Sequence, residues 1–337
     1  MSIFDRLLNT VANTRRAALF RVAQTLMLCA VFAPALSPAA QYPDKPVRII
    51  VPLAAGAGID TFVRALAQRL SKQWNQPVIV DNRPGAGATL GTAAAAKAPA
   101  DGYTLLLGAN PLGISPVVYP NLPYDARRDF VPITLLATTP EALAVSRASG
   151  ITSVAELTAR AKLPGKLNYG SAGNGTLSHL AGLMFSRSAK MDVVHIPFKG
   201  STPELAALLA GQIDWMFDSP AALVPHAKSG SLRLLAVAAP KRTAQVPEVP
   251  TLTELGFSDM EFLIWIGLFA PAGTPDAIVK QIEASTTEAL RDPSLRTSVT
   301  GQGWDIAASS ASEFASFFEA EMKKLGEASR AANLKAE

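Results

Sequence analysis

The sequence predicts an α/β protein of two domains, and three observations lead to this prediction. The chain has 337 residues, and a domain takes roughly 100–200 residues, so two domains are expected. Short apolar runs alternate with helical patterns along the chain, which is typical of parallel βαβ units. Near-identical repeats of roughly 20–50 residues, which would indicate a solenoid, are absent from the sequence.

Residues 1–40 have the composition of an export signal. Four arginines and the single acid Asp5 precede an uncharged apolar run over 22–36, and small residues follow. This order predicts a secretory signal peptide that is cleaved, with an uncleaved anchor as the alternative. Arg15 and Arg16 resemble part of a twin-arginine signal, so the export route stays open. Because Cys29 lies in this segment, the mature chain would contain no cysteine.

The net charge of the chain comes mostly from the same segment. The formal charge is +4, and residues 1–40 supply four arginines minus one aspartate, or +3. The remaining +1 gives no reason to expect a nucleic-acid partner. One cysteine and three histidines exclude a disulfide framework and a Cys-cluster metal site, so we expect no metal.

The first half of the mature chain alternates strands, glycine-rich loops and helices. We expect strands over 47–53, 77–81 and 103–108, a helix with Phe62, Leu66 and Leu70 on one face, and a helix at 93–96. The stretch 102–124 is uncharged, but its four prolines and three glycines predict loop and strand rather than a membrane helix.

The second half continues in the same style. A proline-rich segment over 241–256 is expected to cross the surface. The expected strands are 167–170, 193–198, 213–218, 232–239 and 262–273, and the expected helices are 176–185, 205–209, 275–290 and 312–325.

The first candidate site is VPLAAGAGID, which places Gly56 and Gly58 between a strand and a helix expected to open at Asp60. One interpretation is a dinucleotide site with Asp81 as the ribose-binding acid, although Thr61 replaces the third glycine of that motif. A second is a turn capped by Asp60 that binds nothing. A third is a glycine loop whose N–H groups face a small anion.

The second candidate site is NYGSAGNGTLSHLAG, again at the start of an expected helix. Its glycines allow a ligand to approach the backbone, and its short polar side chains offer hydrogen bonds. A serine nucleophile is not indicated, because Tyr169 replaces the first glycine of a nucleophile elbow, and a structural role is favoured for His179.

Two further polar groups follow expected strands. Lys199 could pair with a carboxylate, Ser201 and Thr202 could cap the next helix, and Asp218 could bind an amine or hydroxyl group. Either charged residue could equally be a solvated loop charge. Open α/β sheets bind ligands at the carboxyl ends of their strands, where all these candidates lie.

Taken together, these segments resemble the Bug-type substrate-binding proteins of tripartite tricarboxylate transport systems. The resemblance runs in consistent order from about Tyr42 to the C-terminus. The segments that carry it are VPLAAGAGID, NRPGAGATLGT, DGYTLLLG, YDARRDFVPI, KLNYGSAGNGTLSHLAG, HIPFKG, VPEVPTLTELG and IWIGLFAPAGTP.

The resemblance implies a two-lobed type II periplasmic binding protein with a mixed sheet in each lobe and the ligand between them. It implies a signal peptide over 1–40, one lobe over 41–142 plus 265–337, and a second lobe over 143–264. It further implies a monomer without catalysis or cofactor, which binds a small carboxylate and meets membrane permease subunits. The implied ligand-binding residues are Leu53, Gly56, Gly58, Asp60, Ser171, Gly173, Asn174, Gly175, Thr176 and His179, with Lys199 and Asp218 near the cleft.

The sequence departs from the family pattern at several of these loops. Leu53 stands where an aromatic residue is usual, Ala57 replaces glycine, Ile59 replaces a hydroxyl residue and Phe198 replaces tyrosine. These changes make the cleft more apolar, so the usual dicarboxylate is not assumed as the ligand. Two other functions stay open, namely an oxidoreductase that uses the Gly56–Asp81 segment and a binding protein that serves as a sensor subunit.

Overall fold

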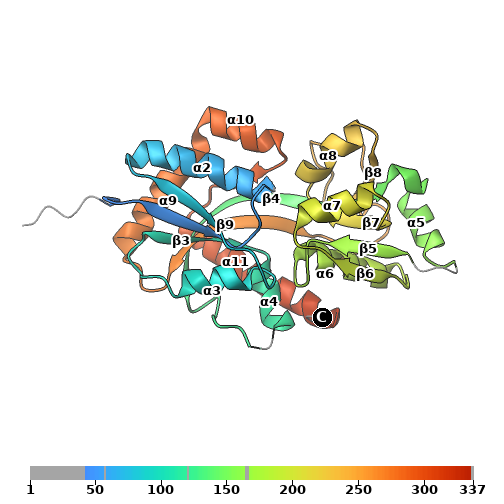
Figure 1. The fold of residues 1–337 in the computed structure, drawn as a ribbon, viewed down its shortest axis with the longest axis horizontal. Coiled ribbons are helices and arrows are strands. Elements are labelled where there is room, and N and C mark those ends of the chain that lie inside the picture. The colour runs from blue at the N-terminus through green and yellow to red at the C-terminus, as the bar shows by residue number, and fades with distance from the viewer. Residues whose placement is uncertain (1–41, 57, 120, 164–166, 335–337) are drawn as a thin grey trace, which may run out of the picture. The chain divides into compact units, whose positions relative to one another are not determined.

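The computed structural model describes residues 42–56, 58–119, 121–163 and 167–334 (Figure 1). The predicted signal peptide, residues 1–40, lies outside the described residues. The chain divides into Met1–Asp44 and Lys45–Glu337, and the fold below is that of the second unit. Within the described ranges, none of the helices is both long and apolar enough to span a bilayer.

A mixed sheet forms the first half of the fold. Its order is β2 (Val78–Asn82), β1 (Val47–Val51), β3 (Thr104–Ala109), β9 (Leu263–Pro271) and β4 (Phe130–Ser146). Strand β1 runs parallel to β2 and β3, whereas β9 runs antiparallel to β3 and β4. The short β10 (Asp305–Ile306) pairs antiparallel with β4.

A second set of strands shares β4. Its members are β5 (Asn168–Ser171), β6 (Val194–Pro197), β7 (Trp215–Asp218) and β8 (Leu232–Ala238). Strand β5 is parallel to β6 and β7, while β4 is antiparallel to β7 and β8. Along β4, the residues up to Pro140 pair with β9, and those from Glu141 onward pair with β8. One continuous strand therefore joins both parts.

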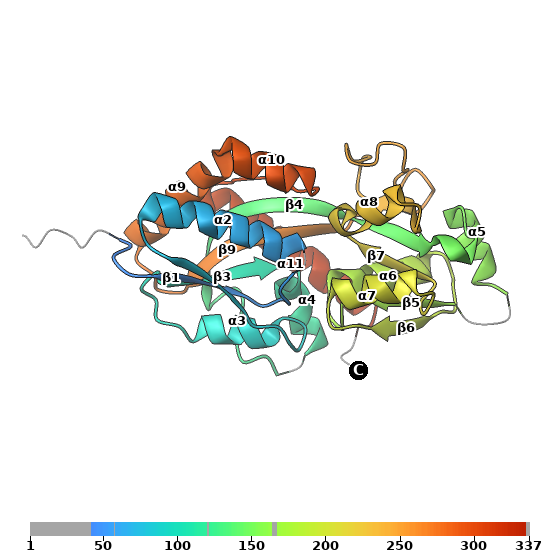
Figure 2. The same ribbon diagram turned by 45° about the horizontal axis from the view of Figure 1, so that its top comes forward.

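Helices cover both faces of the strands (Figures 1 and 2). Helices α2 and α10 lie above the first sheet in Figure 2, and α3 and α4 lie below it. The helices are α2 (Gly58–Trp74), α3 (Thr89–Ala96), α4 (Pro111–Val118), α5 (Val154–Arg160), α6 (Leu177–Ser188), α7 (Ser201–Leu209), α8 (Pro220–Lys228), α9 (Asp276–Arg291), α10 (Pro293–Gly301) and α11 (Ala311–Ala331), with a 3-10 turn at Arg147–Ser149.

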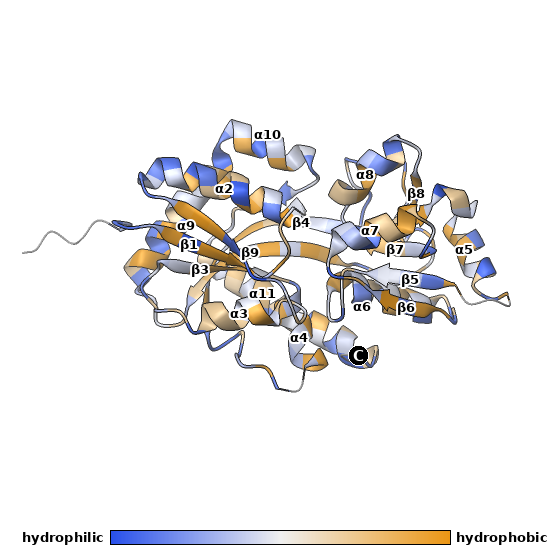
Figure 3. Ribbon diagram, viewed as in Figure 1, coloured by the Kyte–Doolittle hydropathy of each residue, from blue (hydrophilic) through white to orange (hydrophobic). Residues whose placement is uncertain are grey.

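Apolar side chains hold each half together, and Figure 3 shows the strands β1 and β9 as largely hydrophobic. In the first half, Trp265 and Phe269 of β9 pack against Phe314 and Phe318 of α11. Burying large aromatic side chains of this kind contributes roughly 1.5–3 kcal/mol each. In the second half, the corresponding cluster contains Tyr169, Phe185, Trp215 and Phe217.

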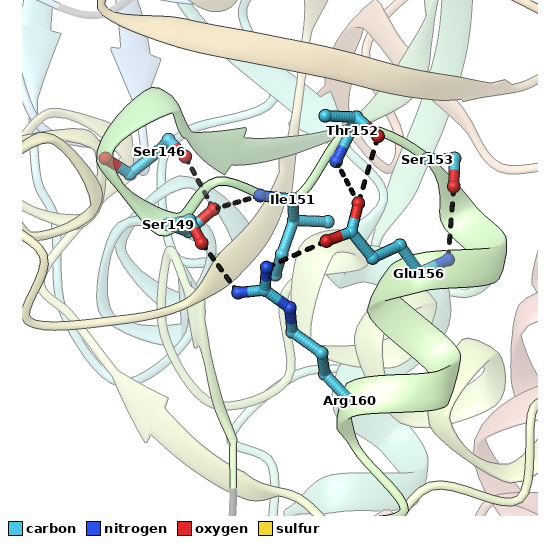
Figure 4. Close-up of polar contacts among 7 residues, drawn as sticks. All are labelled: Ser146, Ser149, Ile151, Thr152, Ser153, Glu156 and Arg160. Carbon is cyan, nitrogen blue, oxygen red and sulfur yellow. Dashed lines mark hydrogen bonds and ion pairs between the residues drawn. The ribbon is translucent and has the colours of Figure 1, made fainter.

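The end of β4 is joined to α5 by a compact set of polar contacts (Figure 4). Ser153 Oγ accepts a hydrogen bond from Glu156 N at 3.1 Å, which caps the first turn of α5. Glu156 accepts from Thr152 N and from Arg160 Nη2, and Arg160 also donates to the carbonyl of Ser149 at 2.6 Å. The backbone bond from Thr152 and the neighbouring Arg160 lower the pKa of Glu156, so the carboxylate that these contacts require stays ionised.

Helix α11 extends beyond its predicted end and reaches the second half. It was expected over 312–325 but continues to Ala331. Leu325, Ala332 and Leu334 belong to the cluster around Tyr169, and Arg187 of α6 donates to the carbonyl of Ala331 at 2.5 Å. The end of the chain therefore packs against residues of both halves.

Several expected elements need correction. The stretch 102–124 was predicted as loop and strand, but it contains α4, which Pro111 can begin because the first turn needs no N–H there. Helix α2 begins at Gly58, so Asp60 lies inside its first turn and is not the cap. The sequence did not predict the long strand β4, because Pro132 and Pro140 interrupt its apolar pattern.

Candidate ligand-binding site

The first glycine loop connects β1 to α2, and hydrogen bonds that Asp60 accepts hold it in place. One carboxylate oxygen of Asp60 accepts from Gly56 N and Arg64 Nε, both at 2.9 Å, and the other accepts from Asn82 Nδ2 at 2.9 Å. Asn82 Nδ2 also donates to the carbonyl of Leu53 at 3.1 Å. Asp60 is only 4% exposed, so it positions the loop and offers no free oxygen to a ligand.

The charge of Asp60 is set by two opposing effects. Burial raises the pKa of the carboxyl group, while hydrogen bonds from Arg64, Gly56 and Asn82 lower it, and the net shift is downward. Asp60 is therefore ionised at neutral pH. Sequence reasoning missed Arg64 and Asn82; the position of Asn82 at the end of β2, beside the end of β1, was the available signal.

The second glycine loop, Ser171–Thr176, uses much of its own hydrogen-bonding capacity. Gly173 N donates to Ser171 Oγ at 3.2 Å and Gly175 N donates to His179 Nδ1 at 3.3 Å. These amides were expected to face the ligand, but the loop itself occupies them. In the described part of the chain, the N–H groups of Asn174, Leu177 and Ser178 have no hydrogen-bond acceptor.

Thr176 ends this loop and begins α6. Its Oγ1 accepts from His179 N at 3.4 Å as the N-cap and donates to the carbonyl of Gly173 at 2.7 Å. Gly173 has φ 133° and Gly175 has φ 76°, values that glycine adopts without strain. The loop shape therefore depends on both the glycines and the threonine.

Two stacked histidines, His179 and His195, contact the second glycine loop. The rings of His179 and His195 lie 3.9 Å apart with an interplanar angle of 10°, and His195 Nε2 lies 2.7 Å from Ser171 Oγ. Burial lowers the pKa of His179 to about 4; burial and the neighbouring His179 lower that of His195 to about 3. Both rings are neutral at pH 7. Ser171 is fully buried, so it and His179 support the loop.

Asp218 lies at the carboxyl end of β7 between two helix N-termini. Its carboxylate accepts from Ser201 Oγ of α7 and from Ser219 N at 2.6 Å. Ser201 was expected to cap α7, but Gly200 occupies the N-cap position and no side chain caps the helix. Burial raises the pKa of Asp218 more than the hydrogen bonds from Ser201 and Ser219 lower it. Lys199 is exposed and has no ion pair among the residues described.

Loops of the two halves meet around these groups. A Cβ built on Gly200 would lie 3.9 Å from Ala54 Cβ, and one built on Gly58 would lie 4.0 Å from Ala221 Cβ. The first glycine loop therefore faces the starts of α7 and α8, on either side of Asp218. On the α4 side, Tyr119 Oη donates to the carbonyl of Asn174 at 3.5 Å.

The open interpretation of a dinucleotide site finds little support in this geometry. Asp81, the candidate ribose acid, forms ion pairs with Arg48 at 3.4 Å and Arg83 at 2.9 Å. Across the described ranges, no cluster of three His, Cys, Asp or Glu side chains is arranged to hold a metal ion.

The chain is similar in sequence to known proteins. The sequence model described as "Tripartite tricarboxylate transporter family receptor" matches residues 62–334. A protein of Pseudomonas sp. strain P51, described as "UPF0065 protein in tcbD-tcbE intergenic region", is 35% identical over 285 residues, covering 84% of this chain and 85% of that protein.

Two solved structures share the fold over nearly their whole length. Periplasmic binding protein BugD has a TM-score of 0.82 and 30% identity, with 88% of this chain and 100% of that chain covered. An R. palustris protein with adipate has a TM-score of 0.83 and 30% identity, with 87% and 99% covered. These similarities confirm the predicted two-lobed α/β fold.

Proposed function

Because the chain belongs to the tripartite tricarboxylate transporter family of receptors, which are solute-binding proteins and not enzymes, we propose that it captures a small carboxylate between its two lobes and delivers it to a membrane permease. We further propose that the protein acts in the periplasm as a monomer, exported by residues 1–40. The proposed lobes are 41–142 with 265–337, and 143–264.

One observation carries the proposal. The first glycine loop of one half faces the N-terminal ends of α7 and α8 in the other half, at Gly200 and Ala221. Helix N-termini stabilise an anion by about 0.3–2 kcal/mol each, and a hydrogen bond to a charged group adds about 1.5–3 kcal/mol. A micromolar ligand needs about 8 kcal/mol, so a few such contacts suffice.

The ligand would also act as the bridge that favours the closed form. A ligand shifts the equilibrium between open and closed lobes only by its preference for one of them. Contacts to the first loop and to the starts of α6, α7 and α8 can exist together only when the lobes are closed. The permease would then distinguish the closed form from the open one.

The proposed binding residues divide by role. Asp60, Ser171 and His179 are fully engaged within the protein and would position the two loops rather than touch the ligand. The residues proposed to approach the ligand are Leu53, Gly56, Gly58, Gly173, Asn174, Gly175, Thr176, Lys199 and Asp218.

A bulky side chain at the second glycine loop tests whether the ligand binds beside this loop. Thr176→Trp should abolish binding in a thermal-shift assay against a panel of carboxylates, because the indole would fill the space beside the loop. Thr176→Ser keeps the helix cap and should bind normally. Loss of the cap costs about 1 kcal/mol, so Thr176→Trp should remain folded by circular dichroism. Unchanged affinity in Thr176→Trp would place the ligand elsewhere, and no binding by any carboxylate to the wild-type protein would reject the ligand class.

A further inference from the structure

A groove of about 330 Å³ lies in the second half of the fold, beside strand β8. It is lined by the later part of α8, by the segment around Val246 and Val249, and by Leu232, Arg233 and Leu234 of β8. Consecutive residues of a strand point to opposite faces of the sheet. A groove that is lined by three consecutive residues therefore lies along the edge of β8 and not over one of its faces.

The edge of β8 along this groove is open. Strand β4 pairs with the opposite edge of β8. On the open edge, the described residues form one bridge, between Val237 and Thr251, in which Val237 N donates to the carbonyl of Pro250 at 2.9 Å. Residues 232–236 have no partner strand there in the described part of the chain. An open strand edge is a template to which another extended chain can add through main-chain hydrogen bonds.

The segment that borders the groove opposite α8 is held in place by the protein itself. Arg242 donates to Glu254 from Nε at 3.0 Å and from Nη2 at 2.5 Å, and its Nη1 donates to the carbonyl of Pro247 at 3.2 Å. Val246 and Val249 are buried in the apolar core of this half. A groove that is already formed needs little further ordering when a partner binds, which favours affinity.

The side chains around the groove are mostly cationic. Arg147, Lys228 and Arg233 line it together with one acid, Glu248. None of the three cations has an ion pair among the residues described. Two copies of this edge would bring like charges together, so pairing with a second copy of the chain is disfavoured. A segment that carries carboxylates would complement the groove.

The groove also borders a contact between the two halves of the fold. Gln245 lines the groove, and a Cβ built on Gly303 of the first half would clash with the side chain of Gln245. Helix α10, which ends two residues before Gly303, and helix α8 both lie at the top of Figures 1 and 2. A partner in the groove would therefore meet a surface that changes when the lobes move apart.

We propose that an extended, acidic segment of the membrane permease adds to the edge of β8 in this groove, with its carboxylates on Arg147, Lys228 and Arg233. This proposal rests on the proposed function and names the surface by which the permease would recognise the protein. The main chain of the segment would pair with residues 232–236. Because the contact at Gln245 requires the two halves to be close, docking would favour the closed form.

Site-specific cross-linking in native cells tests this surface on the whole chain. Benzoylphenylalanine in place of Glu248, an exposed lining residue, should cross-link under ultraviolet light to an integral membrane protein. Mass spectrometry should place the cross-link in an acidic segment outside the membrane spans of that protein. The same photoreactive residue in place of Glu327, an exposed acid of α11, should not give this product.

Charge reversal tests whether the cations carry the interaction. Arg147→Glu combined with Arg233→Glu should reduce the cross-link at least about tenfold, because the reversed charges repel the acidic segment. Lys228→Glu alone should also reduce it, and this exposed position keeps the test valid if the double variant fails to fold. Lys97→Glu combined with Lys280→Glu makes the same change in net charge at exposed positions of the first half and should leave the cross-link unchanged.

Ligand binding separates this proposal from the proposed function. In calorimetric titration against a panel of carboxylates that includes adipate, all charge variants should bind as the wild-type protein does. With ligand binding intact, three results would overturn the docking surface: a cross-link to a second copy of the chain, no membrane-protein product from position 248, or a product that persists in both Lys228→Glu and the double variant. Failure of the wild-type protein to bind any carboxylate would instead reject the proposed function, and the docking proposal with it.

Discussion

His179 and His195 stack face to face at 3.9 Å, and through them the second glycine loop is fixed to β6. His179 accepts from Gly175 N, while His195 contacts Ser171 Oγ. The pair holds both ends of the loop, and both rings must stay neutral to do so.

We expect the stability of the protein to fall as the pH drops below about 6.5. The folded-state pKa values of His179 and His195 are lowered to about 4 and about 3, so the unfolded chain takes up protons first. The stability lost amounts to several kcal/mol by about pH 4, since one pKa unit equals about 1.4 kcal/mol. His195→Gln should lose less free energy of unfolding between about pH 7 and about pH 4, measured by urea titration, because it lacks one of the two groups that the unfolded chain protonates in this range. Parallel pH profiles for the two proteins would contradict this.

A side chain at Gly87 should obstruct closure of the lobes. A Cβ there would lie 2.9 Å from the carbonyl oxygen of Asn174 in the other half. Gly87→Ala is therefore expected to weaken ligand binding at least tenfold, about 1.4 kcal/mol, in calorimetric titration.

Gly211 provides the matched control for this substitution. Gly87 has φ 58° and Gly211 has φ 71°, but a Cβ at Gly211 would meet nothing within 4 Å. Both alanine variants should lose about 1 kcal/mol of stability from backbone strain. Only Gly87→Ala should lose affinity; equal affinities would mean that this contact does not form when the ligand binds.

Replacing Glu204 should stabilise the protein at neutral and alkaline pH. Burial raises the pKa of Glu204, so the folded state retains a proton that the unfolded chain releases above about pH 4.5. Stability is thus lost as the pH rises toward the folded-state pKa. Glu204→Gln should unfold at higher urea concentration at pH 8, by about 1–3 kcal/mol, and like wild type at pH 4. Glu248→Gln should match wild type at both pH values. Equal stability of all three proteins at each pH would exclude a buried Glu204 that titrates between them.

Much of the fold could be predicted from the sequence because strands and helices follow local patterns of residues. The strands expected at 47–53, 77–81 and 103–108 appear as Val47–Val51, Val78–Asn82 and Thr104–Ala109. The exceptions are segments where local and tertiary signals conflict. Helix α4 contains two prolines, and β4 is a strand despite two prolines because pairing on both sides stabilises it.

The sequence by itself determined the α/β class, the family and the two glycine loops at strand ends. Only the tertiary structure decided what holds those loops in place. Asn82 meets Asp60 from 22 residues away, and Ser171 meets His195 from 24 residues away. The buried acids Glu141, Glu204 and Asp218 come from three separate elements. Such contacts depend on how strands pair and helices pack, and no local pattern of residues records them.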